Sequence, residues 1–342
     1  MSSNHQKAIA IWLLICCATI FAMVILGGAT RLTGSGLSMV QWAPIMGILP
    51  PLSLAEWQET FYLYQQFPEY KIKNYGMSLD EFKSIFWFEY SHRLLGRSIG
   101  IIFFFPMLYF FLRGRVEKSL KPKLITMFIL GGLQGLMGWY MVKSGLVANP
   151  HVSQYRLTAH LALAFIIYGY IFWVALDLLF PEQQNNALMN REILKKRSMF
   201  LSIFVFITVL SGGFVAGLKA GLAYNTFPLM NGQLIPDGLL SLDPAWSNFF
   251  ENVTTVQFDH RLLATALFII IPVFWFTSMR NNPPTRLKLG LNLLLAMLAV
   301  QITLGISTLL LHVPVTLAVA HQGGALLLFT ITLFVSHQIR KG

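Results

Sequence analysis

Residues 8–28 read AIAIWLLICCATIFAMVILGG, a run of apolar and small residues that contains no charged side chain. A helix needs about 20 such residues to cross the hydrocarbon core of a bilayer. Seven later runs have a similar length and character, at residues 94–112, 124–142, 157–176, 198–218, 262–279, 289–311 and 313–336. The sequence therefore predicts eight transmembrane segments.

The overall composition agrees with this pattern. Hydrophobic residues make up 55% of the chain and charged residues only 11%, which is far too apolar for an ordinary soluble domain. The runs are long and unbroken, whereas the strands of a membrane barrel would alternate between apolar and polar residues. We therefore expect an all-α integral membrane protein, with the lipid bilayer as its surroundings.

The basic residues predict the orientation of the spans. If the N-terminus lies in the cytoplasm, the segments on that side hold the whole formal excess of +11. The positive-inside rule then places both termini in the cytoplasm, and this asymmetry explains the basic composition without a nucleic-acid partner. The first run is too long for a removable signal sequence, and no transit-peptide pattern is present. The expected location is a bacterial inner membrane.

The chain reads as two copies of a unit with four spans, residues 1–180 and 198–342, joined by a polar cytoplasmic linker at 181–197. Because four is an even number, both copies keep the same orientation, and a pseudo-two-fold axis along the membrane normal is expected. The recurring residues are Gly27-Gly28 with Gly212-Gly213, Gln134 with Gln301, and Gly138 with Gly305, the last two pairs at one offset of 167.

Each half carries two histidines in equivalent spans. The first half contains EYSHRLLGR at 89–97, with His92, and the second contains FDHRLLA at 258–264, with His260. A second histidine follows in a later run of each half, His160 and His321. Histidine is costly in a membrane helix unless it binds something, and two helices of a four-helix bundle can hold a planar ligand between their imidazoles. The pairs therefore predict a bis-histidine haem site in each half, toward the periplasm.

The predicted position of these histidines along their helices also favours iron binding. His92, His160 and His260 are expected at helix mouths, where the partial positive charge disfavours imidazolium and leaves a nitrogen lone pair for iron. His321 is expected about two turns inside its helix. The other four histidines do not recur in this way, and we expect them to be solvated or interfacial: His5, His151, His312 and His337.

A carboxylate distinguishes the two sites. Glu89 precedes His92 by three residues, so both face one side of a helical turn, whereas the uncharged Gln257 stands three residues before His260 in the second half. This favours a reacting site in the first half and an electron-transfer or structural site in the second. An ordinary first-turn carboxylate is the alternative for Glu89. Guanidinium groups bind carboxylates through paired hydrogen bonds, so four arginines are candidates for haem propionates, with interfacial anchoring as the alternative: Arg93, Arg97, Arg156 and Arg261.

Several motifs together resemble one family. They are GGATRLTGSGLS at 27–38, GILPP at 47–51, EYSHR at 89–93, TAH at 158–160, DHR at 259–261 and AHQ at 320–322. Extending from the first span to the eighth, they are similar to haem A synthase. The resemblance implies a haem-dependent oxidoreductase that oxidises the C8 methyl of haem O to a formyl group in two successive steps, giving haem A for terminal oxidases.

The resemblance also implies roles for the site residues. In that family the C-terminal pair, here His260 and His321, ligates a haem b cofactor. The N-terminal pair, here His92 and His160, is assigned to the substrate haem O, and the glutamate that matches Glu89 is required for the chemistry. The implied partners are haem O, a haem O synthase, cytochrome oxidase assembly factors and an electron donor or acceptor.

The sequence departs from part of that family. Some bacterial members have a cysteine pair in the outer loops, whereas the two cysteines here, Cys16 and Cys17, both lie in the first span. The chain therefore looks closer to the proteobacterial and mitochondrial branch. The long outer segment 29–89, with Trp42 and Trp57, is expected to cover the first site.

Two other functions remain open from the residues alone. A cytochrome b-like electron carrier would hold haem in both halves without reacting on either. A transporter would also fit duplicated halves, but transport sites generally lie near the middle of the membrane, whereas these polar groups gather toward one face.

Overall fold

The computed structural model describes residues 3–40, 49–145, 152–181 and 190–341. Eight of its helices are long and apolar enough to cross a membrane. These are α1 (Ser3–Leu32), α4 (Leu79–Leu112), α5 (Lys121–Gly145), α6 (Gln154–Leu179), α7 (Arg191–Leu218), α9 (Val253–Met279), α10 (Thr285–Leu310) and α11 (Val315–Lys341). The predicted all-α fold with eight spans is confirmed.

Shorter helices lie in two of the connections. The segment between α1 and α4 contains α2 (Leu54–Gln65) and α3 (Pro68–Ile72). The segment between α7 and α9 contains α8 (Asn248–Glu251) and two short turns of 3-10 helix, Ala220–Leu222 and Ala245–Ser247.

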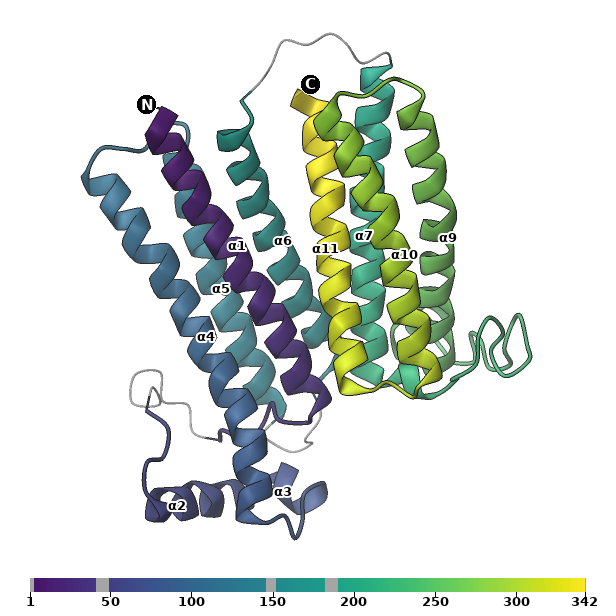
Figure 1. Ribbon diagram of the computed structural model, residues 1–342. Coiled ribbons are helices and arrows are strands. Elements are labelled where there is room, and N and C mark those ends of the chain that lie inside the picture. Colours follow the sequence, from purple (N-terminus) through teal and green to yellow (C-terminus); the bar gives the residue numbers. More distant parts are fainter. Residues whose placement is uncertain (1–2, 41–48, 146–151, 182–189, 342) are drawn as a thin grey trace.

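The long helices form two groups (Figure 1). Helices α1, α4, α5 and α6 lie on one side of the molecule, and α7, α9, α10 and α11 lie on the other. Both described ends of the chain lie at the same end of the bundle, as an even number of spans requires, and α2 and α3 lie at the opposite end. Helices α1, α6, α7 and α11 pack against one another between the two groups. The two-fold relation between the halves stays a prediction.

Several helices begin earlier than their apolar runs. Helix α4 starts at Leu79 rather than at 94, because Ser78 and Glu81 form a capping box: the Ser78 hydroxyl accepts from the Glu81 amide, and the Glu81 carboxylate accepts from the Ser78 amide. Helix α9 starts at Val253, where the Asn252 side chain accepts from two amides. Helix α7 starts at Arg191, so the basic end of the predicted linker is helical, and 182–189 lie outside the described residues.

The early start of α4 builds a layer of helices beyond the apolar run at 94–112. Its first turns pack against α2 through an aromatic cluster that contains Tyr64, Phe82, Phe86 and Tyr90, with Trp57 at its edge. Such clusters contribute their buried area and a further gain from ring geometry. That the outer segment covers the first site stays a prediction, and Trp42 lies outside the described residues.

Paired glycines let the two groups of helices approach closely. A Cβ on Gly28 of α1 would lie 2.5 Å from the Gln322 side chain of α11, and a Cβ on Gly213 of α7 would lie 2.9 Å from the Thr158 hydroxyl of α6. Real Cβ atoms do not approach neighbours this closely, so a larger residue at either position would have to displace the side chain of Gln322 or Thr158. Small residues are the usual means by which membrane helices approach one another.

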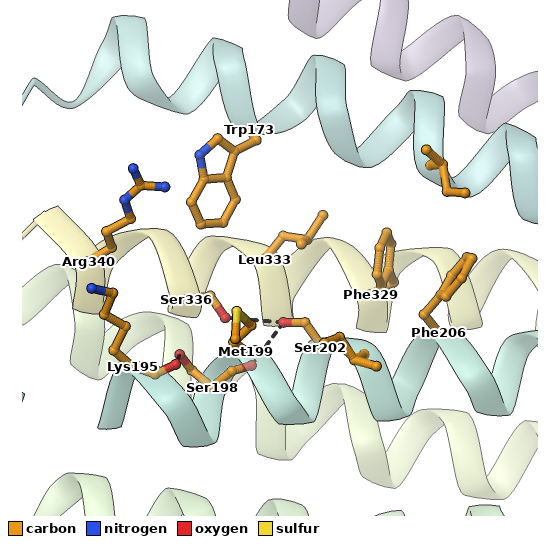
Figure 2. A pocket seen from close by; sticks show the side chains of 12 residues that line it. Trp173, Lys195, Ser198, Met199, Ser202, Phe206, Phe329, Leu333, Ser336 and Arg340 are labelled. Carbon is orange, nitrogen blue, oxygen red and sulfur yellow. Dashed lines mark hydrogen bonds between the residues drawn. The ribbon is translucent and has the colours of Figure 1, made fainter. Parts of the chain in front are cut away.

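A cavity of about 560 Å³ opens between α6, α7 and α11 (Figure 2). None of the four paired histidines lines it, and its charged residues, Lys195 and Arg340, lie in the first turn of α7 and the last turn of α11. The cavity is thus separate from the predicted haem sites.

Candidate functional site

Each of the four paired histidines lies against a glycine of a neighbouring helix. A Cβ on that glycine would approach the imidazole to between 2.9 and 3.2 Å, so a larger residue would displace the ring. The pairs are His92 with Gly27, His160 with Gly138, His260 with Gly212, and His321 with Gly305. The recurring glycines of the sequence therefore make room for the recurring histidines.

The two imidazoles of each half lie close to each other. His92 of α4 and His160 of α6 are near enough to interact electrostatically, and so are His260 of α9 and His321 of α11. The structure thus brings together the residues that the sequence paired. Each of the four histidines is half-buried.

The expected placement at helix mouths is wrong for His92. It lies 13 residues after Leu79, about 20 Å along α4 at 1.5 Å per residue. His160 and His260 lie six and seven residues after the first residues of α6 and α9. Because the effect of the helix dipole falls off within the first turn, it does not explain why these imidazoles stay neutral. The apolar surroundings of a membrane helix are the better reason.

A hydroxyl contacts the far nitrogen of His260. The Ser211 hydroxyl lies 2.7 Å from Nδ1 of His260 and 2.7 Å from the Thr208 carbonyl, which can only accept. A serine hydroxyl has a single proton. With that proton on Thr208, the oxygen accepts from the imidazole Nδ1–H and leaves Nε2 unprotonated, the tautomer that iron ligation requires.

One glutamine contacts the second histidine of each half. Gln301 donates to the His321 carbonyl at 3.0 Å and lies 3.2 Å from Nδ1, and Gln134 donates to the His160 carbonyl at 3.1 Å and lies 3.3 Å from Nε2. In the second half, no hydrogen bond among the described residues reaches Nε2 of His260 or His321. In the first half the Gln134 amide lies beside Nε2 of His160. The buried Nδ1 of His160 has no hydrogen-bond partner among the described residues.

These observations test whether the residues fit haem. Glycines leave room beside all four imidazoles, and both pairs lie within interaction distance. The rings of His160, His260 and His321 each have a side-chain contact at one nitrogen and keep the other nitrogen clear of it. That donor set suits iron with two axial imidazoles. The residues fit, and the second half fits better because both Nε2 atoms are available there.

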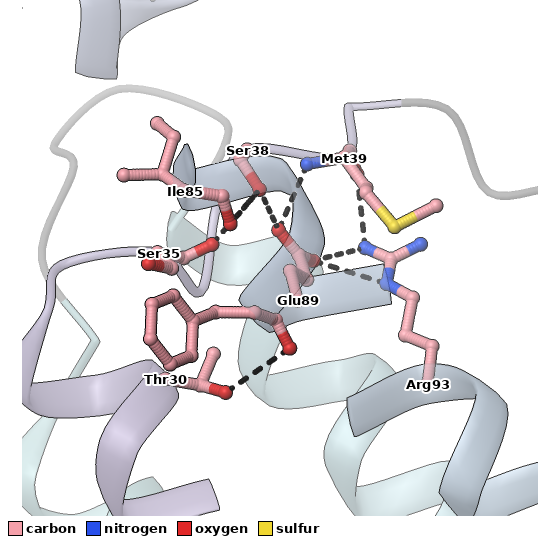
Figure 3. A network of polar contacts seen from close by, with 8 residues as sticks. Thr30, Ser35, Ser38, Met39, Ile85, Glu89 and Arg93 are labelled. Carbon is pink, nitrogen blue, oxygen red and sulfur yellow. Dashed lines mark hydrogen bonds and ion pairs between the residues drawn. The ribbon is translucent and has the colours of Figure 1, made fainter. Parts of the chain in front are cut away.

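Glu89 is held by a buried network (Figure 3). One carboxylate oxygen accepts from the Ser38 hydroxyl and the Met39 amide, both at 2.8 Å, and the other accepts from Nε of Arg93 at 3.0 Å. The Arg93 guanidinium also donates to the Met39 carbonyl at 2.9 Å. Glu89, with only 2% of its surface exposed, therefore ties α4 to the turn that follows α1.

This network differs from the arrangement expected for Glu89. The carboxylate is hydrogen-bonded to residues 38 and 39 and to Arg93, rather than to His92. The partners at 38 and 39 were missed because they lie 50 residues away in the sequence. The sequence did hold a sign of this turn, the glycine and serine residues at 34–36. Gly34 has φ +69°, and the Ser35 amide donates to the Thr30 carbonyl, so the chain turns back after α1.

The candidate propionate partners have different surroundings. Arg93 pairs with Glu89, and Arg261 donates to the carbonyls of Thr226 and Tyr224 at 2.9 and 2.8 Å. Arg156 stacks over the Tyr140 ring at 4.6 Å. Arg97 lies within electrostatic range of Arg93. Arg93 and Arg261 are thus hydrogen-bonded to protein groups, whereas Arg156 makes a cation–π contact. The role of all four remains a prediction.

Two basic residues missed by the sequence reasoning join helices of the two groups. Arg31 of α1 donates to the carbonyls of Ala216 and Gly217 of α7 at 3.2 Å. His337 was expected to be solvated or interfacial, which is wrong: it is fully buried and lies 3.2 Å from the Asp177 carboxylate of α6. His5 and His312 do lie near the ends of helices, and His151 lies outside the described residues.

Comparisons with known proteins give one consistent result. The model of the COX15-CtaA family, described as "Cytochrome oxidase assembly protein", matches residues 10–333. A "Heme A synthase" of Nitrosospira multiformis is 62% identical over 98% of this chain and 94% of its own length, and one of Nitrosomonas eutropha is 54% identical over 99% and 95%. A "Heme A synthase COX15" of Arabidopsis thaliana is 46% identical over 98% of this chain and 75% of its own length.

Proposed function

The chain belongs to the COX15-CtaA family of cytochrome oxidase assembly proteins and functions in heme A synthesis, and we propose that it oxidises the C8 methyl of haem O to a formyl group. Conversion of a methyl to an alcohol and then to an aldehyde removes two electrons in each of two steps. The first step also adds an oxygen atom, so the reaction needs either water as the oxygen source with an electron acceptor or dioxygen with an electron donor. The alcohol is the intermediate that must stay bound or return to the site.

We propose that the two halves divide the work. His260 and His321 would hold a resident haem b, and His92 and His160 would hold the substrate. The observation that carries this division is the hydrogen bonding of the rings: Ser211 and Gln301 contact Nδ1 in the second half and leave both Nε2 atoms clear, whereas Gln134 lies beside Nε2 of His160. The first suits permanent ligation, and the second suits a ligand that is exchanged.

The resident haem b supplies electron transfer when it is bound. This chain's own residues do the rest. The glycines fix how deeply each imidazole enters its helix interface. The ring nitrogens hold the substrate in one orientation, and the α2–α3 layer over α4 limits the access of water to the first half.

Glu89 would place a fixed negative charge beside the first site. Three groups other than its own backbone hold the carboxylate, so its position is set before the substrate binds. A preorganised charge of this kind stabilises positive charge that develops on a reacting carbon. The exchange of a proton with the substrate would require the carboxylate to leave Arg93 first.

We further propose an orientation of the chain in the membrane and its division into two halves. The chain is a multi-pass membrane protein. The concentration of basic residues at the end of the bundle that carries both termini supports a bacterial inner membrane with cytoplasmic termini and haem sites toward the periplasm. The recurrence of the glycine–histidine contacts supports halves at 1–180 and 198–342.

Mass spectrometry of extracted haem tests the proposed reaction. Membranes that contain the chain and a supply of haem O should yield the alcohol and the formyl product. A bis-histidine electron carrier would return its haem unchanged, so recovery of unmodified haem O alone from a well-folded, haem-loaded protein would rule out the enzyme. The named relatives already disfavour the carrier.

A further inference from the structure

The cavity between α6, α7 and α11 has charge at only one end (Figure 2). Lys195 in the first turns of α7 and Arg340 in the last turn of α11 line that end, and none of the described residues that line the cavity is acidic. Glu192 approaches Lys195 only at 3.6 Å, with both side chains exposed, and such surface pairs contribute little. The nearby carboxylate of Asp177 is shared by His337 and Lys341. The cavity thus presents two cations to an incoming group.

Away from this end, the cavity is apolar. Its walls continue along α7 to Phe206 and along α11 to Phe329 and Leu333. From Lys195 to Phe206 the helix rises about 16 Å at 1.5 Å per residue. One leaflet contributes about half of the 30 Å hydrocarbon core. The cavity is therefore as long as one leaflet is deep.

The hydroxyl groups in the cavity already have partners. Ser202 donates to the Ser198 carbonyl at 3.0 Å and lies 3.1 Å from the Ser336 hydroxyl. They do not form the set of unpaired donors and acceptors by which a protein recognises a polar substrate. Recognition here depends on the two cations and on apolar contact.

The cavity is open to the side. Met199 and Ile203 of α7 and Ile166 of α6 line it and expose 59%, 50% and 48% of their surfaces. In a membrane these side chains face acyl chains, so a lipid can enter without a helix moving. Basic pockets between transmembrane helices on the cytoplasmic side are a known form of anionic lipid site.

We propose that this cavity binds one anionic phospholipid from the leaflet on the side of the two termini. Its phosphodiester lies between Lys195 and Arg340, and an acyl chain follows α7 toward Phe206. The lipid contacts α6 of the first group of helices and α7 and α11 of the second, so it fills the space between the two groups. This site is independent of haem chemistry and goes beyond the proposed function.

Lipid retention tests the proposal. The full-length protein is reconstituted with equal parts of phosphatidylglycerol and phosphatidylcholine, transferred to detergent, and analysed by native mass spectrometry for bound lipid. The variant Lys195→Gln/Arg340→Gln removes both cations of the cavity. The control Lys196→Gln/Arg197→Gln removes the same charge from neighbouring exposed residues that do not line it.

We expect wild type and control to retain one phosphatidylglycerol, and the cavity variant to retain it about fivefold less for each charge removed. Ile203→Trp, which narrows the apolar part, should reduce retention while both cations remain. Equal loss in the control and the cavity variant would show only general attraction to a basic surface. Equal retention of phosphatidylcholine or of detergent would show an unspecific apolar groove. Either result overturns the proposal, whatever the state of the haem sites.

Discussion

The Ser211 hydroxyl lies 2.7 Å from Nδ1 of His260, while Leu26 occupies the equivalent position in the first half, one residue before its glycine pair. A group that holds the far nitrogen of a metal-binding imidazole fixes the ring and its tautomer. We therefore expect Ser211→Ala to weaken binding of haem b roughly 10–100-fold. Titration of the haem-depleted protein with haem measures this, and Ser211→Thr, which keeps the hydroxyl, should stay near wild type. Equal affinity in Ser211→Ala would remove the hydroxyl from the account.

Gly138 and Gly135 of α5 provide a matched pair for the first site. A Cβ on Gly138 would lie 3.2 Å from the His160 ring, whereas nothing lies within 4 Å of one on Gly135. Gly138→Ala should therefore lower conversion of haem O, because it displaces the imidazole. Gly135→Ala should leave conversion unchanged and stabilise the helix by roughly 0.5–1 kcal/mol. Rates of product formation compare the two; a similar loss of rate in both would mean that α5 merely tolerates no added methyl groups.

Glu89→Ala should leave haem b bound but cause haem O or the alcohol to accumulate. The substitution also removes the carboxylate that pairs with the Arg93 guanidinium, which keeps its hydrogen bond to the Met39 carbonyl. Loss of one partner of a buried ion pair destabilises a protein by roughly 3–5 kcal/mol. The double variant Glu89→Ala/Arg93→Ala separates the two effects. If it regains stability but not conversion, the charge of Glu89 acts on the substrate. If conversion returns with stability, Glu89 is only a structural anchor.

Glu69 makes the outer layer sensitive to pH. Burial raises its pKa from 4.5 to about 7, although the Tyr64 hydroxyl at 3.2 Å acts in the opposite direction. An acid with a raised pKa binds more protons in the folded state, so stability is greatest below the unfolded pKa and falls as pH rises toward the folded one. The layer should therefore lose at most about 3 kcal/mol between pH 4.5 and 7. Hydrogen exchange of α2 and α3 across this range measures the loss, and Glu69→Gln should abolish the slope.

The fold was largely predictable because each span is a long apolar run. The helix starts were not, since residues 79–93 are amphipathic and carry charges. The Ser78–Glu81 capping box marks the start of α4, but hydropathy alone does not reveal it. As a result, the helix-mouth argument for neutral imidazoles was wrong for His92.

The candidate site was predictable only where it repeats. The repeat in the sequence identified the histidines, glycines and glutamines. It could not predict which of them contact one another across neighbouring helices. Glu89 has no counterpart in the second half, and its partners at 38 and 39 cannot be read from spacing. His337 recurs nowhere and is buried through its contact with Asp177, which is 160 residues away.

Identification of the bound haem in wild type, His260→Ala and His92→Ala tests the central claim most directly. Wild type should carry b-type haem, and His260→Ala should lose its spectrum. His92→Ala should keep that spectrum while failing to convert haem O. Retention of b-type haem by a folded His260→Ala protein, or its loss only in His92→Ala, would contradict the assignment of the two pairs.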